Sequence, residues 1–298
     1  MLKPRNPLTL PAAALALALA ACAPKLYTLN LSPPSQVGWK FALTSSIDEQ
    51  SHSHTIIQLP GVAGSQSDDR DEQFTGRLEG DGEVIKVYPN GGIQELYVLV
   101  KVLEASRGGK VVPNLPGPGA KIVAEREGDK IALSVDGKPA DPAATEALNE
   151  LILLDDEKLT SQQLFGPQAP VSVGSTWPVD PNAVSDVLKS GLGGSADGAK
   201  GTMQFKSVDG SGAAQTATLT GDFSTLAYKP AMPSGIVVDS GSIQGNLTWM
   251  VPTGPDKGTV TISRVLTMSI KAHGSPNGIT LQLEISGQQK RFFEMAFH

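Results

Sequence analysis

The clearest pattern in the chain is a regular alternation of apolar and polar residues over short stretches. The segments Ile279 to Ile285 and Ile131 to Val135 alternate without a break, and between Val260 and Ile270 most apolar residues fall on one face. Alternation with a period of two is typical of strands that have one buried and one solvated face. The sequence therefore predicts a protein that is mainly β, with antiparallel pairing.

The same pattern, bounded by Gly and Pro, predicts further strands at 26–32, 38–46, 52–58, 73–79, 83–88, 120–126, 202–208, 214–221, 236–239 and 243–251. One stretch differs, because Leu96 to Leu103 is apolar at every position except Lys101. A run that is apolar on both sides is typical of a central strand covered on both faces. We therefore expect this strand to lie in the middle of the sheet.

Two short helices are predicted where Asp precedes Pro. Asp141-Pro142 and Asp180-Pro181 each combine a side chain that caps a helix with a Pro suited to the first helical position. Apolar residues follow at helical spacing, and the second helix is expected to end at Gly191. A weaker signal for a short turn lies at Thr160 to Phe165. The expected architecture is a curved antiparallel sheet, or a half-barrel, with about two short helices.

Short sequence similarities between the two halves of the chain predict two similar lobes. Val37-Gly38-Trp39 resembles the segment Val173 to Trp177, and Gly76 to Gly80 resembles Gly241 to Gly245. The expected division is a leader at 1–21, a tether at 22–36, an N-terminal lobe at 37–165 and a C-terminal lobe at 166–298. The alternative is that chains rich in strands reuse Gly-bounded segments without any duplication.

The segment Val173 to Trp177 also carries a resemblance. It is similar to a Val-Gly-Asp-x-Trp segment found midway along uncharacterised β-rich bacterial envelope proteins, although Ser175 stands where those proteins usually have Asp. The resemblance implies a β-rich body and no particular activity. On structural grounds we expect Trp177 to anchor the start of the second lobe in the core.

The first 22 residues have the form of a targeting segment. Lys3 and Arg5 are followed by an apolar run from Leu8 to Ala21, which is too short to span a bilayer as a stable helix. The final residues Leu19-Ala20-Ala21-Cys22 resemble the lipobox of bacterial lipoproteins. That resemblance implies acylation of Cys22 and anchoring of the protein in a membrane. The residue that follows, Ala23, is not the Asp that retains many such proteins at the inner membrane, so the outer membrane is favoured, on its periplasmic face or at the cell surface. The alternative is an incidental Cys in an ordinary signal peptide.

The negative net charge of the chain argues against some classes of binding partner. Removal of the leader with Lys3 and Arg5 leaves 22 basic and 30 acidic residues, a formal charge of −8, and no basic run occurs. Binding to nucleic acid is therefore not expected. Cys22 is the single Cys, so no intramolecular disulfide forms and stability has to come from the core.

No local signature of catalysis is present. The chain has four His residues and lacks a Gly-x-Ser-x-Gly elbow, a His-Glu-x-x-His zinc motif and a phosphate-binding loop. We therefore expect neither an enzyme nor a bound cofactor, although a site assembled from distant residues stays open.

His52 and His54 are the most specific candidates for a metal site. In a strand they share one face and could bind one ion, with a third ligand from Asp68, Asp69, Asp71 or Glu72. The alternative is two exposed His side chains on the wet face of an edge strand. The acidic stretch 65–72 is expected to be a solvated loop, because its spacing does not match that of a calcium loop.

The C-terminal residues are unusually apolar. We expect a last strand that packs Phe293, Met295 and Phe297 on one face of the core, with Lys290 and Arg291 before them in solvent.

Two functions remain open. The first is binding of a lipid-like or other small apolar ligand on a concave sheet face; the residues expected on that face are Leu96, Val98, Val100, Val102, Leu266 and Met268. The same residues fit an ordinary filled core equally well. The second is a structural or interaction scaffold in the cell envelope, which binds another envelope protein and no small molecule.

Overall fold

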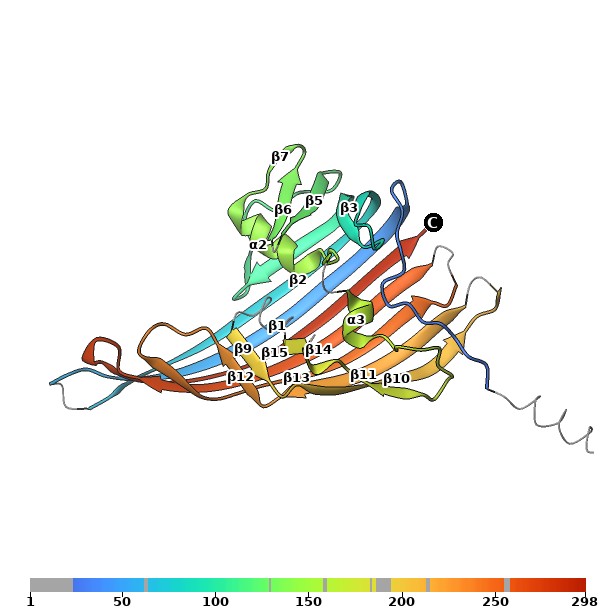
Figure 1. Cartoon of the computed structure of the whole chain (residues 1–298). Helices are drawn as coiled ribbons and strands as arrows, with labels where there is room; N and C mark the ends of the chain where they lie inside the picture. Colours follow the sequence, from blue (N-terminus) through green and yellow to red (C-terminus); the bar gives the residue numbers. More distant parts are fainter. Residues whose placement is uncertain are drawn as a thin grey trace, which may run out of the picture.

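A computed structural model describes residues 24–298, apart from 62–63, 129, 158–159, 183, 186–193, 213–214 and 255–257. The chain forms one large antiparallel sheet that curves strongly and does not close (Figure 1). The prediction of a mainly β protein with a curved antiparallel sheet and few helices is confirmed.

The first part of the chain contributes β1 (Lys40–Gln58), β2 (Gln66–Val87), β3 (Ile93–Arg107), β4 (Lys110–Val111), β5 (Lys121–Glu127), β6 (Lys130–Val135) and β7 (Lys138–Pro139). The helices α2 (Pro142–Leu151) and α3 (Ser161–Phe165) follow. The second part contributes β8 (Thr176–Pro178), β9 (Gly194–Asp197), β10 (Lys200–Asp209), β11 (Thr216–Thr225), β12 (Ala227–Pro230), β13 (Ile236–Pro252), β14 (Thr259–Gly274), the short 3₁₀ turn η2 (Pro276–Gly278) and β15 (Thr280–Phe297).

The first and last long strands are neighbours in the sheet. The main strand order is β7-β6-β5-β3-β2-β1-β15-β14-β13-β11-β10-β8, and β1 pairs with β15 from Phe41 opposite Phe297 to Gln58 opposite Thr280. This central pair joins the two halves, so the sheet continues without interruption across the boundary expected at 165/166.

Two clusters of buried apolar residues lie along the sheet, and neither is confined to one half of the sequence. The first cluster is formed mainly by β1–β6 and α2 but includes Phe293 and Met295 of β15. The second is formed mainly by β9–β14 but includes Leu29 and Leu31. The segment expected to be a tether is therefore packed from Tyr27 onward. Of the strand expected at 26–32, a single bridge from Tyr27 to Val171 forms.

Several strands are longer than the sequence predicted, because Gly does not end them. The strands expected at 73–79 and 83–88 are one strand, β2, in which Gly80 and Gly82 lie against other chain segments. A Cβ on Gly82 would lie 2.3 Å from the Tyr97 carbonyl oxygen and 2.4 Å from the Phe41 ring. These glycines allow close packing within the sheet, and they are not turns.

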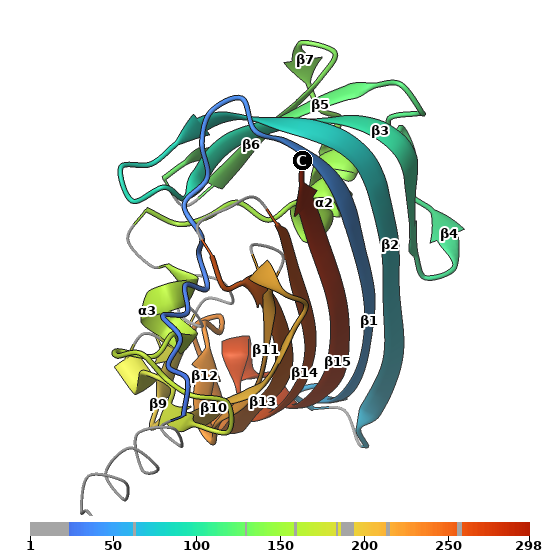
Figure 2. The same cartoon turned by 90° about the vertical axis from the view of Figure 1, so that its right-hand side faces the viewer.

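The expectation that β3 is covered on both faces is wrong. Leu96, Val98 and Val100 are buried in the first cluster, but Leu99 on the opposite face is 44% exposed. The helices and the N-terminal segment lie on the concave side of the sheet, which leaves the convex side in solvent (Figure 2). A nearly continuous apolar run therefore does not imply burial of both faces here.

The helix predicted after Asp141 is confirmed as α2. The Asp141 side chain accepts a hydrogen bond from the Ala143 amide at 3.0 Å, and Leu148 and Leu151 are buried on the sheet. The weaker signal at Thr160 to Phe165 is the helix α3, which begins with a capping box between Thr160 and Gln163. Most of the helix predicted from Pro181 to Gly191 lies outside the described residues.

Candidate functional site

The main cavity lies on the concave side of the sheet, beneath α3 and the N-terminal segment. Its volume is about 350 Å³. The floor is formed by strands β13, β14 and β15 through side chains that share the concave face, among them Leu247, Trp249, Ile262, Leu266, Phe293 and Met295. The opposite wall includes Leu31, Leu164 and Phe165. Most of the lining is therefore apolar.

The wall formed by α3 is held by contacts from distant parts of the chain. The Phe165 ring packs against Phe223 and Trp249, with ring centroids 6.1 and 5.9 Å apart. The indole N–H of Trp177 donates a hydrogen bond to the Phe165 carbonyl at 2.8 Å, and the Leu31 amide donates one to Gln162 at 2.9 Å. Trp177 also packs against the second cluster, as its expected role in the core requires.

Two arginines interrupt the apolar floor. Arg264 of β14 and Arg291 of β15 stand directly opposite each other in the antiparallel register, and both line the cavity. The Arg291 side chain is only 11% exposed and forms an ion pair with Glu150 at the end of α2. Arg264 donates a hydrogen bond to the Gln289 amide oxygen at 3.0 Å, and Gln289 in turn donates one to Glu49 at 2.9 Å.

Burial lowers the pKa of both arginines. Desolvation, followed by repulsion from Arg291, lowers the pKa of Arg264 to about 10, against an opposing effect of Glu150. Desolvation also lowers the pKa of Arg291, although Glu150 and Glu49 oppose the shift. Arg264 is still a cation at neutral pH, because its pKa of about 10 lies well above 7. Arg291 forms an ion pair with Glu150, which favours its charged form. The cavity therefore has two positive charges in an apolar wall.

Two acidic residues, Asp155 and Asp156, also line the cavity, and Asp155 is already bound to the backbone. The Asp155 carboxylate accepts a hydrogen bond from the Ile93 amide at 2.7 Å. Desolvation raises the pKa of Asp155, while this hydrogen bond and the nearby Arg126 act in the opposite direction.

A second hollow of about 360 Å³ adjoins the first. The two share the lining residues Pro33, Val260 and Phe297, and the second also includes Trp39 and Pro252. The open space on the concave face therefore extends beyond the main cavity, along the N-terminal segment.

The structure places the residues expected on the concave face in four different environments. Leu266 lines the cavity, and Met268 packs against the second cluster. Leu96, Val98 and Val100 belong to the filled first cluster. The β2–β3 register shifts between Glu79 and Gly80, which places Val102 opposite Glu79 on the other face. The two alternatives for this face, a groove and a filled core, therefore apply to different parts of the same sheet.

The C-terminal strand is mostly as predicted, with one exception. Phe293, Met295 and Phe297 lie on the concave face, and Lys290 is exposed. The Arg291 side chain, however, is only 11% exposed, so its expected place in solvent is wrong. The reason is the period of two, which puts residue 291 on the same face as residues 293, 295 and 297.

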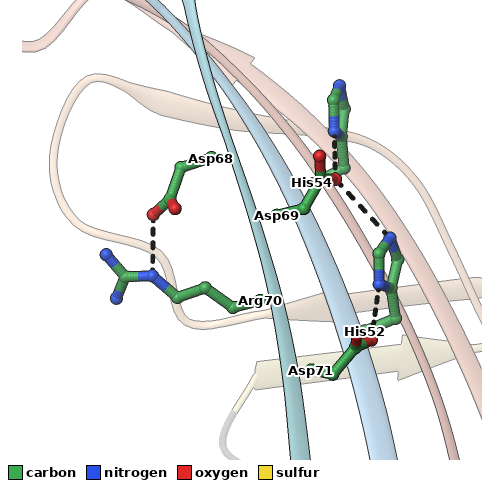
Figure 3. Close-up of polar contacts among 6 residues, drawn as sticks. All are labelled: His52, His54, Asp68, Asp69, Arg70 and Asp71. Atoms are coloured by element: carbon green, nitrogen blue, oxygen red, sulfur yellow. Dashed lines mark hydrogen bonds and ion pairs between the residues drawn. The ribbon is translucent and has the colours of Figure 1, made fainter.

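His52 and His54 lie on the face of β1 opposite to that of Phe41 and Leu43, and neither lines the cavity. Figure 3 shows their contacts with the carboxylates of β2. The Nδ1 atom of His52 is 2.8 Å from Asp71, and that of His54 is 2.6 Å from Asp69. The acidic stretch expected as a loop is the start of β2, which brings these carboxylates opposite the His residues. No cluster of three or more metal-ligating side chains occurs among the described residues.

Cys22, the expected site of lipidation, lies outside the described residues. Across the part of the chain that the structure covers, no helix has the length and apolar character needed to cross a membrane.

Sequence analysis missed Arg264 and Trp249 as site residues. The available signal was the alternation of faces along the strand. Arg264 falls on the same face as Val260, Ile262, Leu266 and Met268 and interrupts an otherwise apolar row. A charge at such a position is exceptional and indicates a buried cation. The position of Trp249 beside it depends on the pairing of β13 with β14, which no local pattern gives.

The fold and the site together define an open, curved antiparallel sheet with an apolar cavity that contains two arginines.

No known family model and no curated protein matches the chain. Among solved structures, the chain is similar to one titled "Lipid-protein interactions in lipovitellin", with 11% identity and a TM-score of 0.30. That match covers 88% of this chain and only 25% of the lipovitellin chain. A second match is a FadL homologue from Pseudomonas aeruginosa, with 7% identity, a TM-score of 0.14 and coverage of 86% and 90% of the two chains. Likenesses this distant carry no functional information.

Proposed function

We propose that the protein is an envelope lipoprotein that binds a lipid-like or other small apolar ligand in the cavity on its concave face. The observation that carries the proposal is the cavity of about 350 Å³ between the sheet and α3. Protein interiors are normally packed with few voids larger than a water molecule. A cavity of about 150 Å³ lined by apolar side chains is already sufficient to bind benzene. The space here suits a larger ligand and lies at the lower end of ordinary ligand sites, about 300–1,000 Å³.

The environment of the cavity supports an apolar ligand. Burial of apolar surface contributes roughly 25 cal/mol per Å² of surface removed from water. Phe165, Ile262, Leu266 and Phe297 line the cavity and are only partly buried, so they still present such surface. A ligand that fills this space would exclude the water that otherwise borders these side chains.

The second part of the proposal is a lipid anchor on Cys22, with the outer membrane as the favoured location. It is supported by the basic residues, apolar run and lipobox-like end of the first 22 residues. Two or three acyl chains hold a protein durably on a membrane, whereas one chain does so only marginally. Metabolic labelling with an alkyne analogue of palmitate, in a two-membrane bacterial host, should label the wild type and not Cys22→Ser. An unlabelled wild type, or recovery of the labelled protein only with the inner membrane, would contradict this part.

The test of ligand binding is native mass spectrometry of the mature chain carrying Cys22→Ser, secreted into the periplasm and purified without detergent. A stoichiometric additional mass, identified after denaturation as an apolar or amphiphilic molecule, is the expected result. A clean mass of the polypeptide alone, unchanged after incubation with lipid extract, would contradict the proposal. It would instead favour the scaffold alternative, for which crosslinking in intact cells would then identify the partner protein.

A further inference from the structure

We propose that the ligand is an amphiphile whose anionic head group, a carboxylate or a phosphate, is bound by Arg264 with Arg291. This inference rests on the proposed function, because it names the chemical class of the ligand held in the same cavity. Its starting point is the placement of two guanidinium groups in a wall formed by residues such as Ile262, Leu266 and Phe293. Transferring a cation into such surroundings is costly unless an anion and hydrogen-bond acceptors compensate for the lost water.

The nearby carboxylates supply only part of that compensation for Arg264, because Glu150 acts on it without forming an ion pair with it. Glu150 forms its ion pair with Arg291, and Glu49 accepts a hydrogen bond from Gln289. The hydrogen bond from Arg264 goes to the neutral amide oxygen of Gln289, and among the described residues no carboxylate forms an ion pair with Arg264. Arg264 is thus a half-buried cation with a polar partner but without an ion pair to any carboxylate of the described residues.

Three N–H donors beside the cavity also lack acceptors. The Nε atoms of Arg264 and Arg291 and the Nε1 atom of Trp249 are buried, and none has a hydrogen-bond partner within the described structure. Trp249 is only 4% exposed, so bulk water does not readily replace the missing acceptor. Guanidinium and indole groups donate hydrogen bonds and accept none. The complementary ligand group is therefore an acceptor, and the two positive charges favour an oxyanion.

The remaining lining indicates that this oxyanion carries an apolar chain. Apart from the arginines, Asp155, Asp156 and a few Ser residues, the cavity wall is apolar, and it adjoins the second hollow through Pro33, Val260 and Phe297. An inorganic anion would use the arginines but leave this surface in contact with water. A hydrocarbon without a head group would fill the cavity but leave the three donors unpaired. An anionic amphiphile satisfies both parts of the site.

The experiment compares four probes on the delipidated mature chain with Cys22→Ser: palmitate, hexadecyl phosphate, hexadecanol and inorganic phosphate. The first three share a chain length and differ in the head group. Isothermal titration calorimetry should give affinities for palmitate or hexadecyl phosphate at least about tenfold higher than for hexadecanol, as expected for a charge-assisted hydrogen bond. Inorganic phosphate alone should bind much more weakly. The stronger of the two anionic probes identifies the head group as carboxylate or phosphate.

Variants separate the head-group site from the cavity itself. Arg264→Met should remove the preference for the anionic probes and leave hexadecanol binding within about twofold. Arg264→Gln provides a second test if the Met variant does not fold. Arg77→Met is the matched control, because Arg77 lies on β2 with a side chain 55% exposed and an ion pair to Glu79. It should bind all probes as the wild type does.

Each contrary outcome has a distinct meaning. Equal affinity for palmitate, hexadecyl phosphate and hexadecanol, unchanged by Arg264→Met, would overturn the head-group proposal while leaving an apolar cavity site intact. If inorganic phosphate bound as tightly as the amphiphiles, the proposal would also be overturned, because the hydrocarbon chain of the probe would then contribute nothing to the affinity. Failure of all three long-chain probes to bind would contradict the proposed function itself.

Discussion

Arg264 and Arg291 face each other across β14 and β15, with both side chains on the concave face of the sheet. Like charges directly opposite each other destabilise a sheet, and here the pair also lies in an apolar wall. Only Arg291 has an ion-pair partner within the described chain, Glu150 of α2. An arrangement that costs stability in the free protein is expected where binding a ligand requires it.

The first prediction concerns the stability of the ligand-free protein. The lowered pKa of Arg264 means that the folded chain binds this proton less tightly than the unfolded chain does. The charged side chain therefore reduces stability at neutral pH, and this cost disappears only as the pH rises above about 10. Arg264→Met should raise the free energy of unfolding at pH 7 by about 1 kcal/mol. Urea denaturation monitored by circular dichroism measures this difference in the free energy of unfolding. A decrease of similar size in the variant would contradict the account.

The second prediction concerns the ion pair between α2 and the sheet. Glu150→Gln removes the partner of a buried guanidinium and should lower the free energy of unfolding by about 3 kcal/mol. Glu146 on the same helix provides the control, because it is 71% exposed and contacts Arg107 at 3.4 Å. Glu146→Gln should change stability by less than about 0.5 kcal/mol. Similar effects of the two variants on urea denaturation would show that the Glu150 pair is not a buried one.

The third prediction concerns glycines within long strands. Gly82→Ala would force a Cβ into the Tyr97 carbonyl and the Phe41 ring, so β1, β2 and β3 would have to move apart locally. We expect a loss of about 2–3 kcal/mol in the free energy of unfolding, as for overpacking of a core. Gly117→Ala is the control, because a Cβ there meets no atom within 4 Å. Equal thermal stability of both variants would be inconsistent with the close approach at Gly82.

The fourth prediction concerns pH. Desolvation raises the pKa of Asp155 above its ordinary value of about 3.9 in an unfolded chain. Between the two pKa values the folded protein holds more protons than the unfolded one, so this group lowers stability as the pH rises through that interval. Asp155→Asn keeps a side-chain acceptor for the Ile93 amide and removes the titration. As the pH rises from 4, the melting temperature of the wild type should therefore fall relative to that of Asp155→Asn. A rise of the wild type relative to the variant would contradict the shift.

Much of the fold follows from local pattern, and the remainder depends on long-range pairing. Alternation predicts the strands, and the Asp-Pro cap at Asp141 predicts α2. The adjacency of β1 and β15 has no local signal, because it joins residues more than 200 positions apart. Gly80 and Gly82 resemble turn residues in sequence, and only the neighbouring segments show why glycine is required there.

The site could be predicted only in part. The alternation of faces that places Phe293 and Met295 on the core side of the strand also places Arg291 there, so its burial follows from the same pattern. Arg264 is detectable as the charged position on an apolar face. The cavity itself depends on α3 and the N-terminal segment covering part of the sheet without filling it, which sequence periodicity does not specify.

The central claim is that the cavity beneath α3 holds an apolar or amphiphilic ligand, and a cavity-filling variant tests it most directly. Leu266→Trp places an indole in the cavity, whereas Leu99→Trp adds the same group on the convex face at a side chain that is 44% exposed. Both would be made in the mature chain with Cys22→Ser and compared by native mass spectrometry after incubation with palmitate. We predict that the parent and Leu99→Trp retain a stoichiometric ligand and that folded Leu266→Trp does not. Retention by Leu266→Trp at the parent's level, or no ligand on any of the three, would contradict the account.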